Sequence, residues 1–188
     1  MKKIIPILVL LGICLILPPA EAASPYKKTL KKWTRTDTTY RTSDLQEIVG
    51  LRATLLTDEM IEAQGRLHAK VYRLGAADEL AVKEGIKAKR GSGTLFFVSF
   101  YGGERRFADL TNPKAGWDLR LTVGSHTYLP EKITPISFPH TPVDLMNYPY
   151  LDVWDRGYFI LFPVSWKNPA DFKMAVYGPQ GGAELEWN

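Results

Sequence analysis

Cysteine is almost absent from the sequence, since Cys14 is the only one among 188 residues. A single thiol cannot form an intramolecular disulfide, so a disulfide framework is excluded as a source of stability. Because Cys14 lies in a segment that we expect to be removed, thiol chemistry is excluded as well. The fold must therefore be held together by a hydrophobic core.

An apolar run long enough to cross a membrane is also missing. The stretch from Ile4 to Leu17 is shorter than the roughly 18 to 20 residues that a membrane-spanning helix needs, and two prolines follow it. Lysines precede it, and the small-x-small pattern Ala20-Glu21-Ala22 comes after it, as in a signal peptide. We predict a signal peptide at residues 1–22, cleaved near Ala22, and an exported protein that is periplasmic or secreted.

Catalytic and metal-binding motifs are lacking too. The sequence has no Gly-x-Ser-x-Gly elbow, no phosphate-binding glycine loop and no His-Glu-x-x-His pair, and no second metal ligand lies three or four residues from His68 on its predicted helix. Its aspartates do not follow a calcium-binding spacing and are typical of turns. We expect no cofactor, no metal and no catalysis, although glycosidase carboxylates carry no short signature.

The charge is mildly positive. Loss of Lys2, Lys3 and Glu21 with the signal peptide takes the formal net charge from +4 to +3, which gives little steering toward polyanions. We expect no nucleic-acid partner. The predicted basic N-terminal leader, residues 23–43, could make weak contact with an anionic membrane surface, or it could be a solvated strand. The lysines concerned are Lys27, Lys28, Lys31 and Lys32.

The first half of the remaining chain changes periodicity once. Residues 45–56 alternate between apolar and polar, which predicts a half-buried strand. Thr57 is a potential N-cap, and after it apolar residues recur at spacings of three and four residues. This pattern predicts a helix that ends near Gly75. A second helix is predicted from Asp78 to Arg90, with Leu80, Val82 and Ile86 facing inward and Gly91 as its terminator.

The second half has the pattern of β-strands. Residues 95–101 are apolar on both faces, as in a central covered strand, and residues 117–129 form a hairpin pattern. Pro135 restricts the strand at 133–138 to an edge or a bulge. Further strands are expected at 158–164, 172–176 and 184–187, the last two as a hairpin.

Together these patterns predict a mainly β (α+β) fold. We expect an antiparallel immunoglobulin-like β-sandwich of about seven strands in one domain, residues 44–188, with a two-helix insertion at 57–90 after the first long strand. The cysteine and tryptophan spacing of true immunoglobulin domains is absent. The resemblance is therefore one of architecture, which does not assign a function.

A long loop, His140 to Gly157, is the best candidate site. It is stiffened by prolines and rich in aromatic side chains, which can stack on sugar rings or pack on a protein partner. Equally, its tyrosines and tryptophan could fold back and close the core. The candidate binding residues are His140, Tyr148, Tyr150, Asp152, Trp154, Asp155 and Arg156.

Two functions follow from this loop. The first is a non-catalytic binding or assembly module of the cell envelope, with an envelope protein or a glycan as its ligand, acting through the loop or through a sheet edge. Among the edges, the terminal strand ending at Trp187 is expected to be more open than the Pro135 strand. The alternative is a small envelope hydrolase that uses loop carboxylates such as Asp152 and Asp155.

Overall fold

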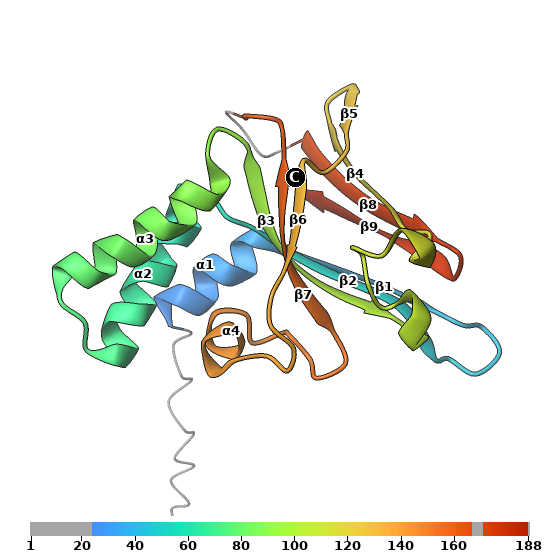
Figure 1. Cartoon of the computed structure of the whole chain (residues 1–188), viewed down its shortest axis with the longest axis horizontal. Coiled ribbons are helices and arrows are strands. Elements are labelled where there is room, and N and C mark those ends of the chain that lie inside the picture. Colours follow the sequence, from blue (N-terminus) through green and yellow to red (C-terminus); the bar gives the residue numbers. More distant parts are fainter. Residues whose placement is uncertain (1–23, 167–170, 188) are drawn as a thin grey trace, which may run out of the picture.

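The computed structural model describes residues 24–166 and 171–187, and the predicted signal peptide lies outside them. Within these residues the chain forms two antiparallel sheets and four α-helices, an α+β fold that is mainly β. The helices lie on one face of the larger sheet, and the smaller sheet covers its other face (Figure 1). No helix in the described part of the chain is long and apolar enough to span a membrane.

The larger sheet has five strands in the order β1-β2-β3-β7-β6. They are β1 (Thr34–Tyr40), β2 (Glu47–Leu55), β3 (Thr94–Gly102), β7 (Arg156–Phe162) and β6 (Lys132–Pro135). β3 is central, and every residue in it except Tyr101 is buried, which confirms the predicted strand covered on both faces. β6 lies at an edge, where a proline without an N–H group is tolerated.

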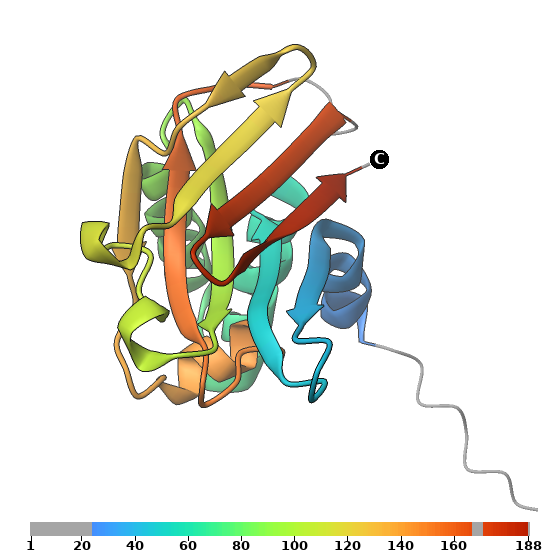
Figure 2. The same ribbon diagram turned by 90° about the vertical axis from the view of Figure 1, so that its right-hand side faces the viewer.

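The smaller sheet has four strands in the order β5-β4-β8-β9, and it crosses in front of the larger sheet in Figure 2. Its strands are β5 (His126–Tyr128), β4 (Asp118–Val123), β8 (Phe172–Gly178) and β9 (Gly181–Trp187). Both predicted hairpins are present, β4 with β5 and β8 with β9. Two single 3₁₀ turns, Arg105–Phe107 and Pro113–Ala115, lie between β3 and β4.

Successive side chains along the strands of the larger sheet point to opposite faces, so the fold has two hydrophobic cores. Side chains such as Phe96, Val98 and Phe100 face the smaller sheet and share one core with it, where the Phe96 ring packs against Phe172 and Trp187. The intervening side chains face the helices and form a second core. This second core contains Tyr26, Leu30, Leu56, Met60, Leu95, Phe97, Tyr148 and Leu151.

Both predicted helices between β2 and β3 are present, as α2 (Asp58–Tyr72) and α3 (Ala76–Arg90). The Thr57 hydroxyl caps α2 by accepting a hydrogen bond from the Met60 N–H at 3.1 Å. The prediction that Leu80 faces inward was wrong, because its side chain is 56% exposed. α3 instead contacts α2 through Lys83, whose stem lies over Gly65 and whose ammonium pairs with Glu62 at 2.7 Å.

The segment predicted as a basic leader is part of the fold. It forms helix α1 (Pro25–Trp33) followed directly by β1, and Tyr26 and Leu30 of α1 are buried in the second core. The lysines of α1 face away from that core, so the helix is amphipathic. Leu45, predicted to begin the first strand, lies in the β1–β2 turn with a positive φ and is exposed.

β1 also joins the two sheets at one side of the sandwich. Its inward side chains contact the backbone of β9: the Arg35 Nε–H donates to the Glu186 carbonyl at 2.8 Å, and the Thr39 hydroxyl donates to the Gly182 carbonyl at 2.6 Å. Between them, the carboxylate of Asp37 accepts from the Glu184 N–H at 2.8 Å. The terminal edge that we expected to be open is therefore occupied by side chains.

Candidate functional site

The candidate loop begins with a short helix, α4 (Pro142–Asn147), which the sequence analysis did not predict. A capping box starts it: the Thr141 hydroxyl accepts from the Asp144 N–H, and the Asp144 carboxylate accepts from the Thr141 N–H at 3.0 Å. The helix leads the chain back over the outer face of the larger sheet. The aromatic residues that follow are thus placed against that face.

Tyr148 and Tyr150 fold onto the sheet and close the second core. The Tyr148 ring stacks on Phe97 with parallel planes, and its hydroxyl accepts a hydrogen bond from the amide of Gln64 at 2.9 Å. The Tyr150 hydroxyl bonds to that of Thr54 at 2.6 Å. Burial raises the pKa of both tyrosines well above the usual value, so both hydroxyls keep their protons.

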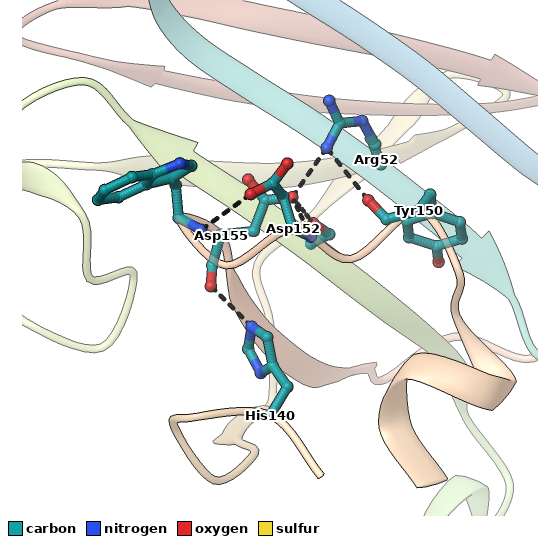
Figure 3. A network of polar contacts seen from close by, with 7 residues as sticks. Arg52, His140, Tyr150, Asp152 and Asp155 are labelled. Atoms are coloured by element: carbon teal, nitrogen blue, oxygen red, sulfur yellow. Dashed lines mark hydrogen bonds and ion pairs between the residues drawn. The ribbon is translucent and has the colours of Figure 1, made fainter. Parts of the chain in front are cut away.

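Asp155 is the most enclosed carboxylate of the loop, at 3% exposure. Its Oδ2 accepts hydrogen bonds from Arg52 Nη1 at 2.8 Å, from the Ser99 hydroxyl and from the Asp152 N–H at 3.4 Å. Arg52 also donates to the Tyr150 carbonyl at 3.3 Å, so it joins two points of the loop to β2 (Figure 3). Arg52 and Ser99 are direct neighbours in the β2–β3 register.

The turn between Asp152 and Asp155 is fixed from both sides. The Trp154 N–H donates to Asp152 Oδ1 at 3.2 Å, and the Asp155 N–H donates to the Asp152 carbonyl at 3.2 Å. Behind the turn, Nε2 of His140 donates to the Asp155 carbonyl at 2.9 Å (Figure 3). This turn presents the Trp154 side chain to solvent, where it is 75% exposed.

A pocket of about 360 Å³ lies beside the turn, and we call it the loop pocket. Asp152, Trp154 and Asp155 form its loop side, and residues of the β1–β2 turn, β2 and β3 form the opposite side. The latter residues are Gln46, Glu47, Arg52 and Tyr101. Its size is at the lower end of the range for small-ligand sites, and its lining combines two aromatic rings with four charged groups and one amide.

Gly50 makes room for a carboxyl group beside this pocket. A Cβ there would overlap the Glu47 carboxyl and would meet the Tyr101 Cβ at 3.3 Å. Partial burial raises the pKa of Glu47 above its usual value, and the charges of Asp155 and Asp152 raise it further, whereas Arg52 acts in the opposite direction. Glu47 therefore holds its proton more tightly than an exposed glutamate.

The loop pocket brings together three of the seven predicted site residues, Asp152, Trp154 and Asp155. His140 braces the turn from behind. Arg156 points elsewhere, toward Asp109 Oδ2 at 3.9 Å and the Phe138 ring. Tyr148 and Tyr150 are among the loop residues that close the core.

The sequence analysis missed the half of the pocket that comes from the sheet. Glu47, Arg52 and Tyr101 reach the loop only because β2 and β3 pair in the observed register. One sequence signal was available: Gly50 interrupts an alternating strand, and such a glycine marks the close approach of another group.

The described residues contain no cluster of potential metal ligands, and the comparisons with known proteins find no match. No group of three or more histidine, aspartate or glutamate side chains in residues 24–166 and 171–187 is arranged to hold a metal ion. No family model matches the chain, and no curated protein or solved structure is significantly similar to it.

Proposed function

We propose that this protein is an exported, non-catalytic binding module of the cell envelope that holds a glycan in the loop pocket. The observation that carries the proposal is Trp154, whose large apolar face is 75% exposed beside a pocket with polar lining. An indole left in water at a pocket edge offers an aromatic face on which a sugar ring can stack. The export part of the proposal rests on the signal-peptide pattern of residues 1–22.

The polar side of the pocket supports the same ligand class. Asp152, Glu47 and Arg52 offer hydrogen-bond acceptors and donors to hydroxyl groups. Arg52 bonds to Asp155 and to the Tyr150 carbonyl, and Asp155 also accepts from Ser99, so these groups are ordered before a ligand arrives. Less conformational entropy is then lost on binding.

Assembly through a sheet edge is the weaker form of the binding proposal. At β9 the backbone groups are bonded to β1 side chains, so of the two edges that the sequence pointed to, β6 is the better candidate for strand addition. The predicted likeness to immunoglobulin-like sandwiches, whose end loops bind ligands, belongs to this proposal as well.

Truncation of Trp154 tests the proposal directly. We expect the wild-type protein to bind glycans from envelope polysaccharides with a change in indole fluorescence. Trp154→Ala should weaken that binding by about tenfold or more, because loss of a central aromatic contact costs about 2 kcal/mol. The control is Tyr177→Ala, which removes an exposed aromatic ring from the smaller sheet. Equal binding by wild type and Trp154→Ala would refute the proposed site.

A small glycan hydrolase is the second candidate, and Glu47 is the observation that favours it. A carboxyl group with a raised pKa beside a second carboxylate, here Asp152, is the arrangement that a general acid requires. Asp155 is a poorer candidate because Arg52 and Ser99 occupy its Oδ2. Release of reducing ends during the same glycan titrations, lost in Glu47→Gln, would favour the hydrolase.

A further inference from the structure

A second hollow, of about 250 Å³, lies between α1 and β1, and we call it the α1 groove. Its lining contains two ammonium groups and two threonine hydroxyls but no carboxylate. The lining residues are Lys27, Leu30, Lys31, Thr34, Thr36 and Tyr150. Lys27 and Lys31 are one helical turn apart, so they lie on the same face of α1.

The two lysines of the groove are available for a ligand. Neither takes part in an ion pair among residues 24–166 and 171–187, whereas Lys32 of the same helix pairs with Glu59 at 2.6 Å. Both are exposed. An anion in the groove could therefore meet two ammonium groups without breaking a salt bridge.

A chain of hydroxyl groups adds a directed donor. The Tyr150 hydroxyl lies 2.6 Å from that of Thr54, which lies 2.7 Å from that of Thr34. Either oxygen of each pair can be the donor, but three hydroxyl protons share two bonds, so one end of the chain, Thr34 or Tyr150, keeps a proton that it can donate into the groove that both residues line.

The α1 groove adjoins the loop pocket. Thr36, which lines the groove, is the register partner of Arg52, which lines the pocket. Arg52 also donates to the carbonyl of Tyr150, and Tyr150 lines the groove. The two hollows carry opposite charges, since three carboxylates and one guanidinium line the pocket and two ammonium groups line the groove.

From this arrangement the geometry points to the α1 groove as an oxyanion subsite for the same glycan that the loop pocket holds, and this inference rests on the function proposed above. Lys27, Lys31 and the donating end of the hydroxyl chain bind a phosphate, sulfate or carboxylate group of the glycan, while an uncharged sugar unit stacks on Trp154. The carboxylates of the pocket repel the anionic group, which fixes the direction in which the glycan lies. The ligand class is thus an acidic glycan.

The first test compares two oligosaccharides that differ only in one phosphate group. We expect the wild-type protein to bind the phosphorylated form more tightly, and Lys27→Gln/Lys31→Gln to weaken it by about tenfold while binding of the neutral form stays within about twofold. Lys28→Gln, an exposed lysine of α1 outside the groove, is the matched control and should leave both affinities unchanged. Equal affinity of the wild type for the two forms would overturn the subsite.

The second test uses inorganic phosphate and nuclear magnetic resonance on the full chain. Phosphate should shift the amide signals of Thr34 and Thr36 in the wild type and in Trp154→Ala, but not in the double lysine variant. If these signals do not move, the subsite fails even when glycans bind at Trp154. If these signals move as expected but glycan binding does not depend on Trp154, the subsite stands and the proposed function fails.

A third measurement separates a glycan from a lipid surface. Vesicles of phosphatidylglycerol in phosphatidylcholine would attract all exposed lysines of α1. Lys28→Gln and the double variant would then lose a similar amount of vesicle binding for each positive charge that is removed. Vesicle binding of that kind, with no preference for the phosphorylated oligosaccharide, would replace the oxyanion subsite by a membrane contact.

Discussion

At the residue scale, the candidate site is shaped by how charged groups are neutralised. Asp155 is buried, but Arg52, Ser99 and the Asp152 N–H all bond to its Oδ2. Removal of either member of a largely buried ion pair leaves the other without compensation, so this pair has a structural role. Glu47 differs, because within residues 24–166 and 171–187 no Lys or Arg forms a salt bridge with it, and partial burial, followed by the charges of Asp155 and Asp152, raises its pKa.

The raised pKa of Glu47 predicts how stability depends on pH. The folded chain keeps the Glu47 proton to a higher pH than the unfolded chain does. This contribution to stability is present below the ordinary glutamate pKa and is lost as the pH rises through the folded pKa. We therefore expect Glu47→Gln to be more stable than the wild type at pH 7 and equal to it near pH 3, measured by urea unfolding.

Glu59 provides the opposite control for this measurement. The hydrogen bond from Lys32 lowers the pKa of Glu59, and the bond from Trp33 acts in the same direction. Glu59→Gln should therefore lose stability at pH 7 relative to the wild type. If both glutamine variants changed stability in the same direction, the raised pKa of Glu47 would not be the cause of its effect.

At the element scale, β1 and β9 depend on each other. Side chains of Arg35, Asp37 and Thr39 satisfy the outward backbone groups of β9, which would otherwise be an exposed template for strand addition. This arrangement uses polar residues on the inward face of an edge strand. It explains why β1 is rich in threonine and charge although it belongs to a sandwich.

Loss of these bonds should open the β9 edge. Asp37→Ala/Thr39→Val removes both of these hydrogen bonds to β9, together with the bond that Asp37 Oδ1 accepts from the Thr38 N–H, and we expect it to destabilise the fold by about 2 kcal/mol in thermal or urea unfolding. The exposed edge should also produce dimers in analytical ultracentrifugation. Thr38→Ala, on the opposite face of β1, is the control and should remain monomeric with a smaller loss. A monomeric double variant would contradict the role of β1 as an edge cover.

Elements with a strong local pattern were predictable from the sequence, whereas α1 and β1 were not. The periodicity and caps of α2 and α3, and the apolar run of β3, identify them without tertiary information. In α1 the apolar residues Tyr26, Leu30 and Trp33 have helical spacing, but the lysines between them favour a solvated segment. In β1 the alternating threonines fit a strand, but no buried apolar side marks it.

The candidate site was half predictable for a similar reason. A proline-stiffened aromatic loop is a local feature, so the sequence identifies Asp152, Trp154 and Asp155. Which side chains face that loop depends on strand register, since Arg52 and Tyr101 are far from it in sequence. The sequence also cannot tell which aromatic residue packs inward, and here Tyr148 does so while Trp154 does not.

At the scale of the whole molecule, the amino-terminal segment connects all three layers. α1 covers the outer face of the larger sheet and β1 extends that sheet (Figure 1). The side chains of β1 reach the smaller sheet. Trp187, near the end of the chain, donates from its indole nitrogen to the Trp33 carbonyl at 3.0 Å. Both the α1 groove and the covered β9 edge exist because this segment is in place.

A chain that begins at Asp44 should consequently fail to fold, although the sequence patterns place the domain boundary there. Its loss of Tyr26 and Leu30 from the second core costs about 2 kcal/mol for each side chain, and it also exposes the edges of β2 and β9. Together these losses are comparable with the roughly 5 to 15 kcal/mol that stabilises a typical domain. We expect circular dichroism and hydrogen exchange to show an unfolded or aggregating chain, whereas a chain that begins at Ala23 should unfold cooperatively. If the shorter chain kept protected amides in β2 and β9, residues 24–43 would be an accessory to the domain, and the α1 groove could not be treated as a fixed part of the glycan site.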